Sequence, residues 1–155
     1  MMVTALLMWF FQNLLQVFFM GWVLMPDLFF MYMFYQTTAL GSKLPGAIWV
    51  AFLGGLLWDL RWSSLLGLNA IAYVGALMLV FWLWNLMPKS GRTPLIFASI
   101  MFMGHLCVAV FRLVVLGVTS QHMLHQVVLQ QAYAVVLSFI FGFVFFKRGE
   151  KSNAS

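Results

Sequence analysis

Residues 93–118 read TPLIFASIMFMGHLCVAVFRLVVLGV, which is an apolar run. His105 is its only histidine, and Arg112 is its only charged residue. About 20 consecutive apolar residues are enough for a helix to cross the hydrocarbon core of a bilayer. This stretch exceeds that length and contains no turn signal in its interior. It therefore predicts a membrane-spanning helix.

The rest of the chain has the same character. Of its 155 residues, 65% are hydrophobic and 7% are charged, and the mean hydropathy is +1.02. A soluble protein has ~45–50% apolar and ~25% charged residues, so this chain lacks the polar side chains needed to cover a surface in water. We expect an all-α integral membrane protein. At about 20 residues per span plus short links, the length accommodates a compact bundle of six helices.

Turn residues divide the chain into six predicted helices, at residues 3–20, 26–41, 45–59, 65–87, 93–118 and 124–146. Pro26 and Asp27 favour the start of the second helix. Its roughly 15 residues rise only about 22 Å, so it either spans with local thinning of the bilayer or is sheltered by other helices. We expect one transmembrane domain over residues 1–146 and a short, polar, disordered tail over residues 147–155.

The basic residues gather on one side of the predicted bundle. With six spans, both termini and the links after the second and fourth helices share a side, and Arg61 lies on the other. Basic residues are retained on the cytoplasmic side, so we predict a multi-pass protein of the cytoplasmic membrane with both termini in the cytoplasm. The cations are too scattered to indicate nucleic-acid binding. Those on the predicted cytoplasmic side are Lys43, Lys89, Arg92, Lys147, Arg148 and Lys151.

Two charged residues are predicted to lie within or at the end of a span. A charge at the centre of a span costs about 2.5–3.5 kcal/mol on insertion scales, so it usually has a partner or a wet path. Asp59 ends the third helix, and Arg112 precedes the outer end of the fifth. We expect them to pair or to line one outward-facing pocket, with Asn69 and His105 as neighbours. Alternatively, the long Arg112 side chain reaches the interface and Asp59 pairs with Arg61.

Small residues recur at a spacing of four on the third helix, at Ala47, Ala51 and Gly55. Such a stripe lets helix backbones approach closely, either inside the bundle or against another membrane protein. If the chain docks against a partner, the most exposed candidate sites are expected to be this stripe and the outer ends of the helices. The residues at those ends are Asp27, Asp59 and Arg61.

The first helix carries Gln12, Asn13 and Gln16 within one and a half turns. Spacings of three and four place Gln16 on the same face as the other two. This face is predicted to turn away from lipid, toward the bundle or toward a partner.

Catalytic motifs are not found in the sequence. It contains no nucleophile elbow, HExxH zinc pair or glycine-rich phosphate loop. His122 and His125 are three residues apart but have no carboxylate or thiol near them in sequence. We therefore expect no enzymatic activity, no cofactor and no metal.

The segment from residue 26 to residue 72 resembles the MreD family, the rod shape-determining membrane proteins of bacteria. Three motifs carry the resemblance in order: Pro26-Asp27-Leu28, then Gly54-Gly55-Leu-Leu-Trp-Asp59-Leu60, then Ser63-Ser64-Leu-Leu-Gly67-Leu68-Asn69-Ala70. Leu65 stands where the family usually has a proline. The chain length, the expected number of spans and the near absence of soluble loops agree with the family over the whole chain.

The resemblance implies a non-enzymatic scaffold of the machinery that elongates the peptidoglycan wall. Such a protein would bind MreC directly, and MreB, RodA and the elongation transpeptidase directly or through MreC. The implied fold is similar to the substrate-binding subunits of energy-coupling-factor transporters. That likeness supplies the alternative function, binding of a vitamin-like molecule near Asp59, Asn69 and Arg112. Those subunits typically show an Ala-x-x-x-Ala pattern in the first helix, where this chain has only Ala5.

Overall fold

The computed structural model of the protein describes residues 2–19, 24–38, 43–62, 65–117 and 120–145. Within these residues the chain forms six α-helices and no β-strand, as predicted. A 3-10 turn, η1 (Lys89–Gly91), joins the fourth and fifth helices, and a π-helical stretch, η2 (Phe141–Phe145), continues the sixth. The helices are α1 (Met2–Phe18), α2 (Leu28–Thr38), α3 (Leu44–Trp62), α4 (Leu68–Leu86), α5 (Pro94–Leu116) and α6 (Gln121–Ile140).

Three helices are long and apolar enough to cross a membrane: α4, α5, and α6 extended by η2 as far as Val144. The apolar helix α1 is shorter. Helix α2 has 11 residues and rises roughly 16 Å, so it is too short to cross a ~30 Å core. The helices around it bury nine of its side chains. The sheltered arrangement expected for a short second helix is therefore the one observed.

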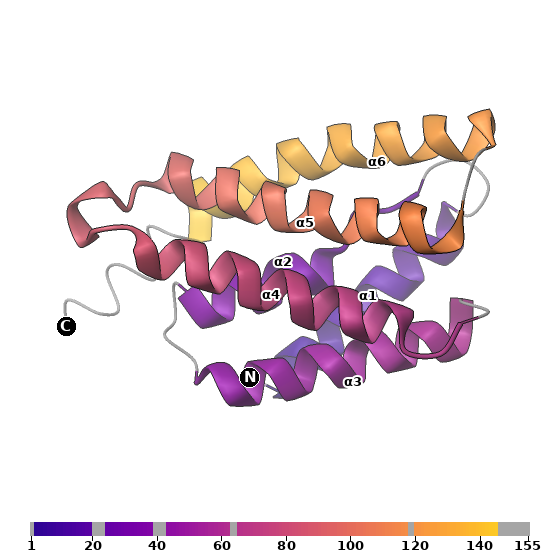
Figure 1. The fold of residues 1–155 in the computed structure, drawn as a ribbon, viewed down its shortest axis with the longest axis horizontal. Coiled ribbons are helices and arrows are strands. Elements are labelled where there is room, and N and C mark those ends of the chain that lie inside the picture. Colours follow the sequence, from indigo (N-terminus) through magenta and orange to yellow (C-terminus); the bar gives the residue numbers. More distant parts are fainter. Residues whose placement is uncertain (1, 20–23, 39–42, 63–64, 118–119, 146–155) are drawn as a thin grey trace.

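The helices form two layers. In Figure 1, α3, α4, α5 and α6 lie in chain order, each antiparallel to the next, while α1 and α2 lie behind them. Helix α2 packs against α3, α4 and α5 and supplies much of the apolar core. Its Phe34 stacks on Phe97 of α5 with ring centroids 5.0 Å apart. Phe30 stacks on Tyr73 of α4 at 6.1 Å.

The link between α3 and α4 differs from the prediction. Helix α3 continues past Asp59 to Trp62, and α4 begins at Leu68 rather than at Leu65. The reason lies in Gly67, whose φ of 91° is in the left-handed region that glycine adopts without strain. The start of α4 is therefore fixed by the position of this glycine.

The small-residue stripe of α3 lies inside the bundle. Ala47 and Ala51 are at most 1% exposed. A Cβ atom added to Gly55 would lie 2.4 Å from the Cα atom of Ala70, so the backbones of α3 and α4 touch here. Of the two roles predicted for this stripe, packing inside the bundle is the one observed, and the exposed docking face is not.

The helix-end carboxylates are also more buried than expected. Asp27 and Asp59 are each 1% exposed, because both accept hydrogen bonds from neighbouring parts of the chain. Arg61, in the last turn of α3, is exposed. It is the one of the three that still presents its side chain at the surface.

Candidate functional site

The chain before α2 is non-helical and lies among the helices. Inside a membrane protein, such backbone is tolerated only where other groups satisfy its N–H and C=O groups. The N–H of Met25 donates to Gln16 Oε1 at 3.0 Å, and its carbonyl accepts from Gln130 Nε2 at 2.8 Å. The N–H of Asp27 donates to His105 Nε2 at 3.1 Å. Side chains of α1, α5 and α6 therefore hold this segment in place.

The carboxylate of Asp27 is the centre of a buried cluster. Arg112 forms a bidentate ion pair with it, from Nη1 to Oδ2 at 2.8 Å and from Nη2 to Oδ1 at 3.2 Å. The Tyr73 hydroxyl donates to Oδ1 at 2.8 Å, and Gln12 Nε2 does so at 3.2 Å. We call this cluster the polar hub, made of Gln12, Asp27, Asn69, Tyr73, His105 and Arg112.

The guanidinium of Arg112 is held on several sides. Its Nε donates to Asn69 Oδ1 at 2.5 Å, and Nη2 also donates to the Tyr73 hydroxyl at 3.1 Å. Its Cζ atom lies 5.4 Å from the centroid of the Tyr73 ring, within cation–π range. Arg112 therefore lies in a fixed position and does not extend freely to the interface.

The expected ion pair between Asp59 and Arg112 is not formed, because Arg112 pairs with Asp27 instead. The two residues are nevertheless linked. Asn69 accepts from Arg112 and donates from Nδ2 to Asp59 Oδ1 at 2.6 Å. The prediction that Asn69 and His105 lie near Arg112 agrees with this geometry, since all three belong to the polar hub.

Asp59 caps the helix that follows it. Its carboxylate accepts the N–H of Gly67 at 2.9 Å and the N–H of Asn69 at 3.1 Å. The first N–H groups of a helix lack partners within the helix, and a carboxylate at that end is also favoured by the helix dipole. Gly67 has no side chain to act as a cap, so α3 supplies one to α4.

His105 connects α5 to α6. Its Nε2 accepts a backbone N–H, so in the neutral ring the proton is on Nδ1, which donates to Gln131 Oε1 at 3.0 Å. In this tautomer the 3.9 Å approach of Nε2 to Asp27 Oδ2 is not an ion pair. The ring is fully buried and acts as a hydrogen-bonded bridge between helices.

The first-helix amides also face the bundle. Gln12 Oε1 accepts the N–H of Phe29 at 2.7 Å, near the start of α2, while Nε2 contacts Asp27. Asn13 is 2% exposed. The choice between a face toward the bundle and a face toward a partner is therefore decided in favour of the bundle.

The hub is suited to fixing helices relative to one another. Its members tie α1, α4 and α5 to the segment before α2, and His105 extends the network to Gln131 of α6. In the part of the chain that the structure describes, no group of three or more His, Cys, Asp or Glu residues is placed to hold a metal ion.

Sequence reasoning missed three features of the hub: Asp27 as the partner of Arg112, the role of Tyr73 and the contact of Gln12 with Asp27. The available signal was the presence of polar side chains within three apolar helices and beside the start of a fourth. Which of them meet depends on how the helices are arranged, and spacing along one helix does not reveal that.

Comparison with known protein families identifies this chain's relatives at the level of a family. The family model described as rod shape-determining protein MreD matches residues 1–148 of the 155-residue chain. No curated protein and no solved structure matches the chain. The family match includes every residue of the polar hub.

Proposed function

This chain belongs to the MreD family of rod shape-determining proteins, and we propose that it is a scaffold subunit of the bacterial cell-elongation complex that binds MreC. Membership of the family implies a role in rod-shape determination. The proposal goes further in its partners: MreC bound directly, with the MreB filament, RodA and the elongation transpeptidase bound directly or through MreC. The match over residues 1–148 is the observation that carries it.

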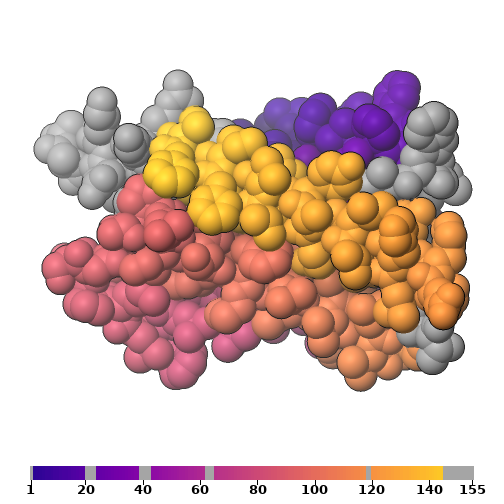
Figure 2. Space-filling view, turned by 90° about the horizontal axis from the view of Figure 1, so that it is seen from above, coloured from indigo at the N-terminus to yellow at the C-terminus, as the bar shows by residue number. Residues whose placement is uncertain are grey.

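The exposed helix surfaces support a role in packing against other spans. Helix α1 buries Ala5, Gln12 and Asn13 and leaves most of its apolar side chains exposed, among them Leu7 at 62% and Phe18 at 81%. Helix α6 lies across one face of the molecule, as Figure 2 shows. Surfaces of this kind are covered in a membrane either by lipid or by the helix of a partner.

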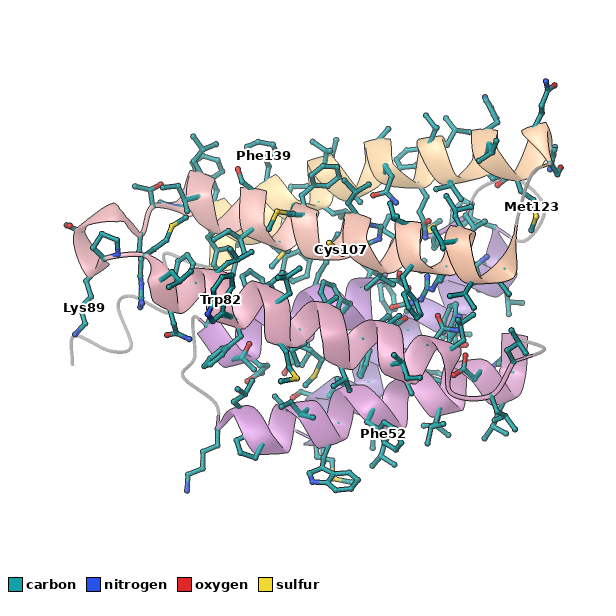
Figure 3. All side chains as sticks on the ribbon, in the orientation of Figure 1. Phe52, Trp82, Lys89, Cys107, Met123 and Phe139 are labelled. Carbon is teal, nitrogen blue, oxygen red and sulfur yellow. The ribbon has the colours of Figure 1, made fainter. Side chains whose placement is uncertain are left out.

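The proposed orientation places both termini in the cytoplasm. Figure 1 shows the start of α3 and the α4–α5 turn at one end of the bundle, and Figure 3 labels Lys89 there. Lys43 and Lys89 are exposed at that end, and Arg61 is exposed at the other. This distribution supports a cytoplasmic-membrane protein oriented by its basic residues. The proposed cytoplasmic tail, with Lys147, Arg148 and Lys151, lies outside the described residues.

The alternative function is a vitamin-binding transporter subunit. It would use Asp59, Asn69 and Arg112 to hold a ligand. In the structure Asn69 bonds to both of the other residues, and Arg112 is paired with Asp27. Because these groups are already engaged with one another, their arrangement supports a structural role.

Co-purification tests the proposal. The full-length chain carrying an affinity tag would be coexpressed with MreC from the same organism, extracted in mild detergent and purified. We expect MreC to be enriched over an unrelated single-span protein expressed at the same level. Equal recovery of MreC and this control would refute direct binding. A vitamin-like molecule found in the purified protein by mass spectrometry would support the alternative instead.

A further inference from the structure

A cavity of about 170 Å³ lies between α5 and α6, beside the polar hub. Figure 1 shows the two helices well separated at the end where they are joined, and Figure 3 places Met123 there. The opposite end of this helix pair is tight, since a Cβ atom added to Gly142 would lie 2.8 Å from the carbonyl oxygen of Pro94. The cavity therefore follows from the way that α6 diverges from α5.

The walls of this cavity are mostly apolar. Ala109 of α5 and Val127 of α6 are among the side chains that line it, and Arg112 and Gln130 are its polar members. An apolar cavity of ~150 Å³ is large enough to bind benzene, so a cavity of this size accommodates a short length of hydrocarbon. The occupant it fits is apolar with one polar group at its end.

Arg112 determines which polar group fits. An arginine side chain has five N–H donors, and four of them are used in its contacts with described residues of the polar hub. Its side chain is 16% exposed. Because the Asp27 carboxylate already balances its charge, the remaining N–H favours a neutral acceptor and does not require an anion.

We propose that this cavity binds the part of a phospholipid acyl chain nearest its ester, whose carbonyl accepts a hydrogen bond from Arg112. Phospholipids surround helices that cross a membrane, and each of their chains joins a hydrocarbon segment to a neutral carbonyl acceptor. The bound chain would fill the space between α5 and α6 next to the polar hub. This inference rests on the membrane location of the chain and does not require that MreC binds.

Paired lipids test the polar contact. Delipidated full-length protein in detergent would be incubated with diester phosphatidylglycerol or with its diether analogue, which has the same chains and headgroup but no carbonyls. Native mass spectrometry would measure the bound fraction. We expect about tenfold weaker binding of the ether lipid, the loss expected for one hydrogen bond to a charged group. Equal binding of the two lipids would overturn the role of Arg112.

A headgroup comparison separates this site from an anion site. Diester phosphatidylcholine should bind as well as diester phosphatidylglycerol, and inorganic phosphate should displace neither. A strong preference for the anionic lipid, or displacement by phosphate, would show that the headgroup determines binding, and the proposal would be wrong.

A pair of neighbouring residues tests the location. Val127→Trp fills the cavity, whereas Val128→Trp changes a side chain that is 66% exposed and does not line it. We expect Val127→Trp to lower retention of the diester lipid about tenfold, as a clash costing more than ~1.4 kcal/mol would do, and Val128→Trp to leave it unchanged. Equal retention by both variants would refute the site.

A smaller substitution guards against misfolding. If Val127→Trp does not elute as a single species in gel filtration, Ala109→Leu fills the same cavity from α5 and takes its place. Co-purification of MreC with the lipid-deficient variant then separates the two proposals. Loss of lipid with MreC retained supports the cavity assignment and leaves the scaffold proposal intact.

Discussion

Asp27 and Arg112 lie 85 positions apart in the chain, and their buried ion pair joins the segment before α2 to α5. Replacing a whole buried ion pair by apolar groups is often neutral, but removing one partner leaves an unpaired buried charge. The value of this pair therefore lies in specificity, because it fixes the start of α2 beside α5. The sequence indicated that Arg112 needs a partner but did not distinguish Asp27 from Asp59. Asp27 starts one helix and Asp59 ends another, and both were expected at the outer side of the membrane.

A double-mutant cycle checks this interpretation. We expect Asp27→Asn and Arg112→Gln each to destabilise the protein by about 3–5 kcal/mol, because each isolates the opposite charge. The double variant should lose clearly less than the sum of the two, since neither charge then remains. Thermal unfolding in detergent, followed by intrinsic fluorescence, measures both. Additive losses of stability would show that the two side chains do not interact. Lys89→Gln, at the exposed turn between α4 and α5, serves as the control.

Tyr73 was not singled out by sequence reasoning, because a tyrosine in an apolar helix is usually part of the packing. Its hydroxyl donates to Asp27 and accepts from Arg112. Tyr73→Phe should therefore lower the free energy of unfolding by about 1–3 kcal/mol. Tyr133→Phe, at a side chain that is 49% exposed, is the matched control and should change it by less than ~0.5 kcal/mol. Equal unfolding temperatures for the two variants would show that the Tyr73 hydroxyl contributes nothing to the stability of the polar hub.

At the scale of the helices, apolar runs and turn residues predicted six elements, and all six are present among the described residues. The errors are at the ends. The start of α4 was misplaced because Gly67 sets it. The cap that Asp59 of α3 provides to α4 was missed, because capping between helices leaves no pattern in local spacing. The small-residue stripe of α3 was identified correctly as a close-packing face, but a sequence does not specify whether such a face meets its own chain or another.

Two glycines test the packing of α3 against α4. Gly55→Ala brings a Cβ atom within 2.4 Å of the Ala70 backbone and should cost about 1–3 kcal/mol through overpacking. Gly75→Ala places its Cβ in open space and should stabilise the protein by up to ~1 kcal/mol, because alanine favours a helix more than glycine does. The two variants therefore differ in sign. A stabilising Gly55→Ala would show that the two backbones do not touch.

At the scale of the whole molecule, composition was sufficient to predict an all-α membrane protein, because so few charged residues cannot cover a surface in water. The arrangement into a four-helix layer with α1 and α2 behind it was not predictable in the same way. Apolar side chains face both lipid and protein, so their spacing does not show which helix covers which. The non-helical segment before α2 is held by side chains from three other helices, and that arrangement is visible only in three dimensions.

The orientation in the membrane gives the last prediction. Ser90 lies in the α4–α5 turn and Ser120 precedes α6, and both are exposed at opposite ends of the bundle (Figure 1). In a Cys107→Ser background, Ser120→Cys should react with a membrane-impermeant maleimide in intact spheroplasts. Ser90→Cys should react only after the membrane is opened, because the basic residues around it favour the cytoplasm. The reverse labelling pattern would mean that the protein has the opposite orientation in the membrane. Labelling of both cysteine variants in intact spheroplasts would show that α5 does not cross the membrane.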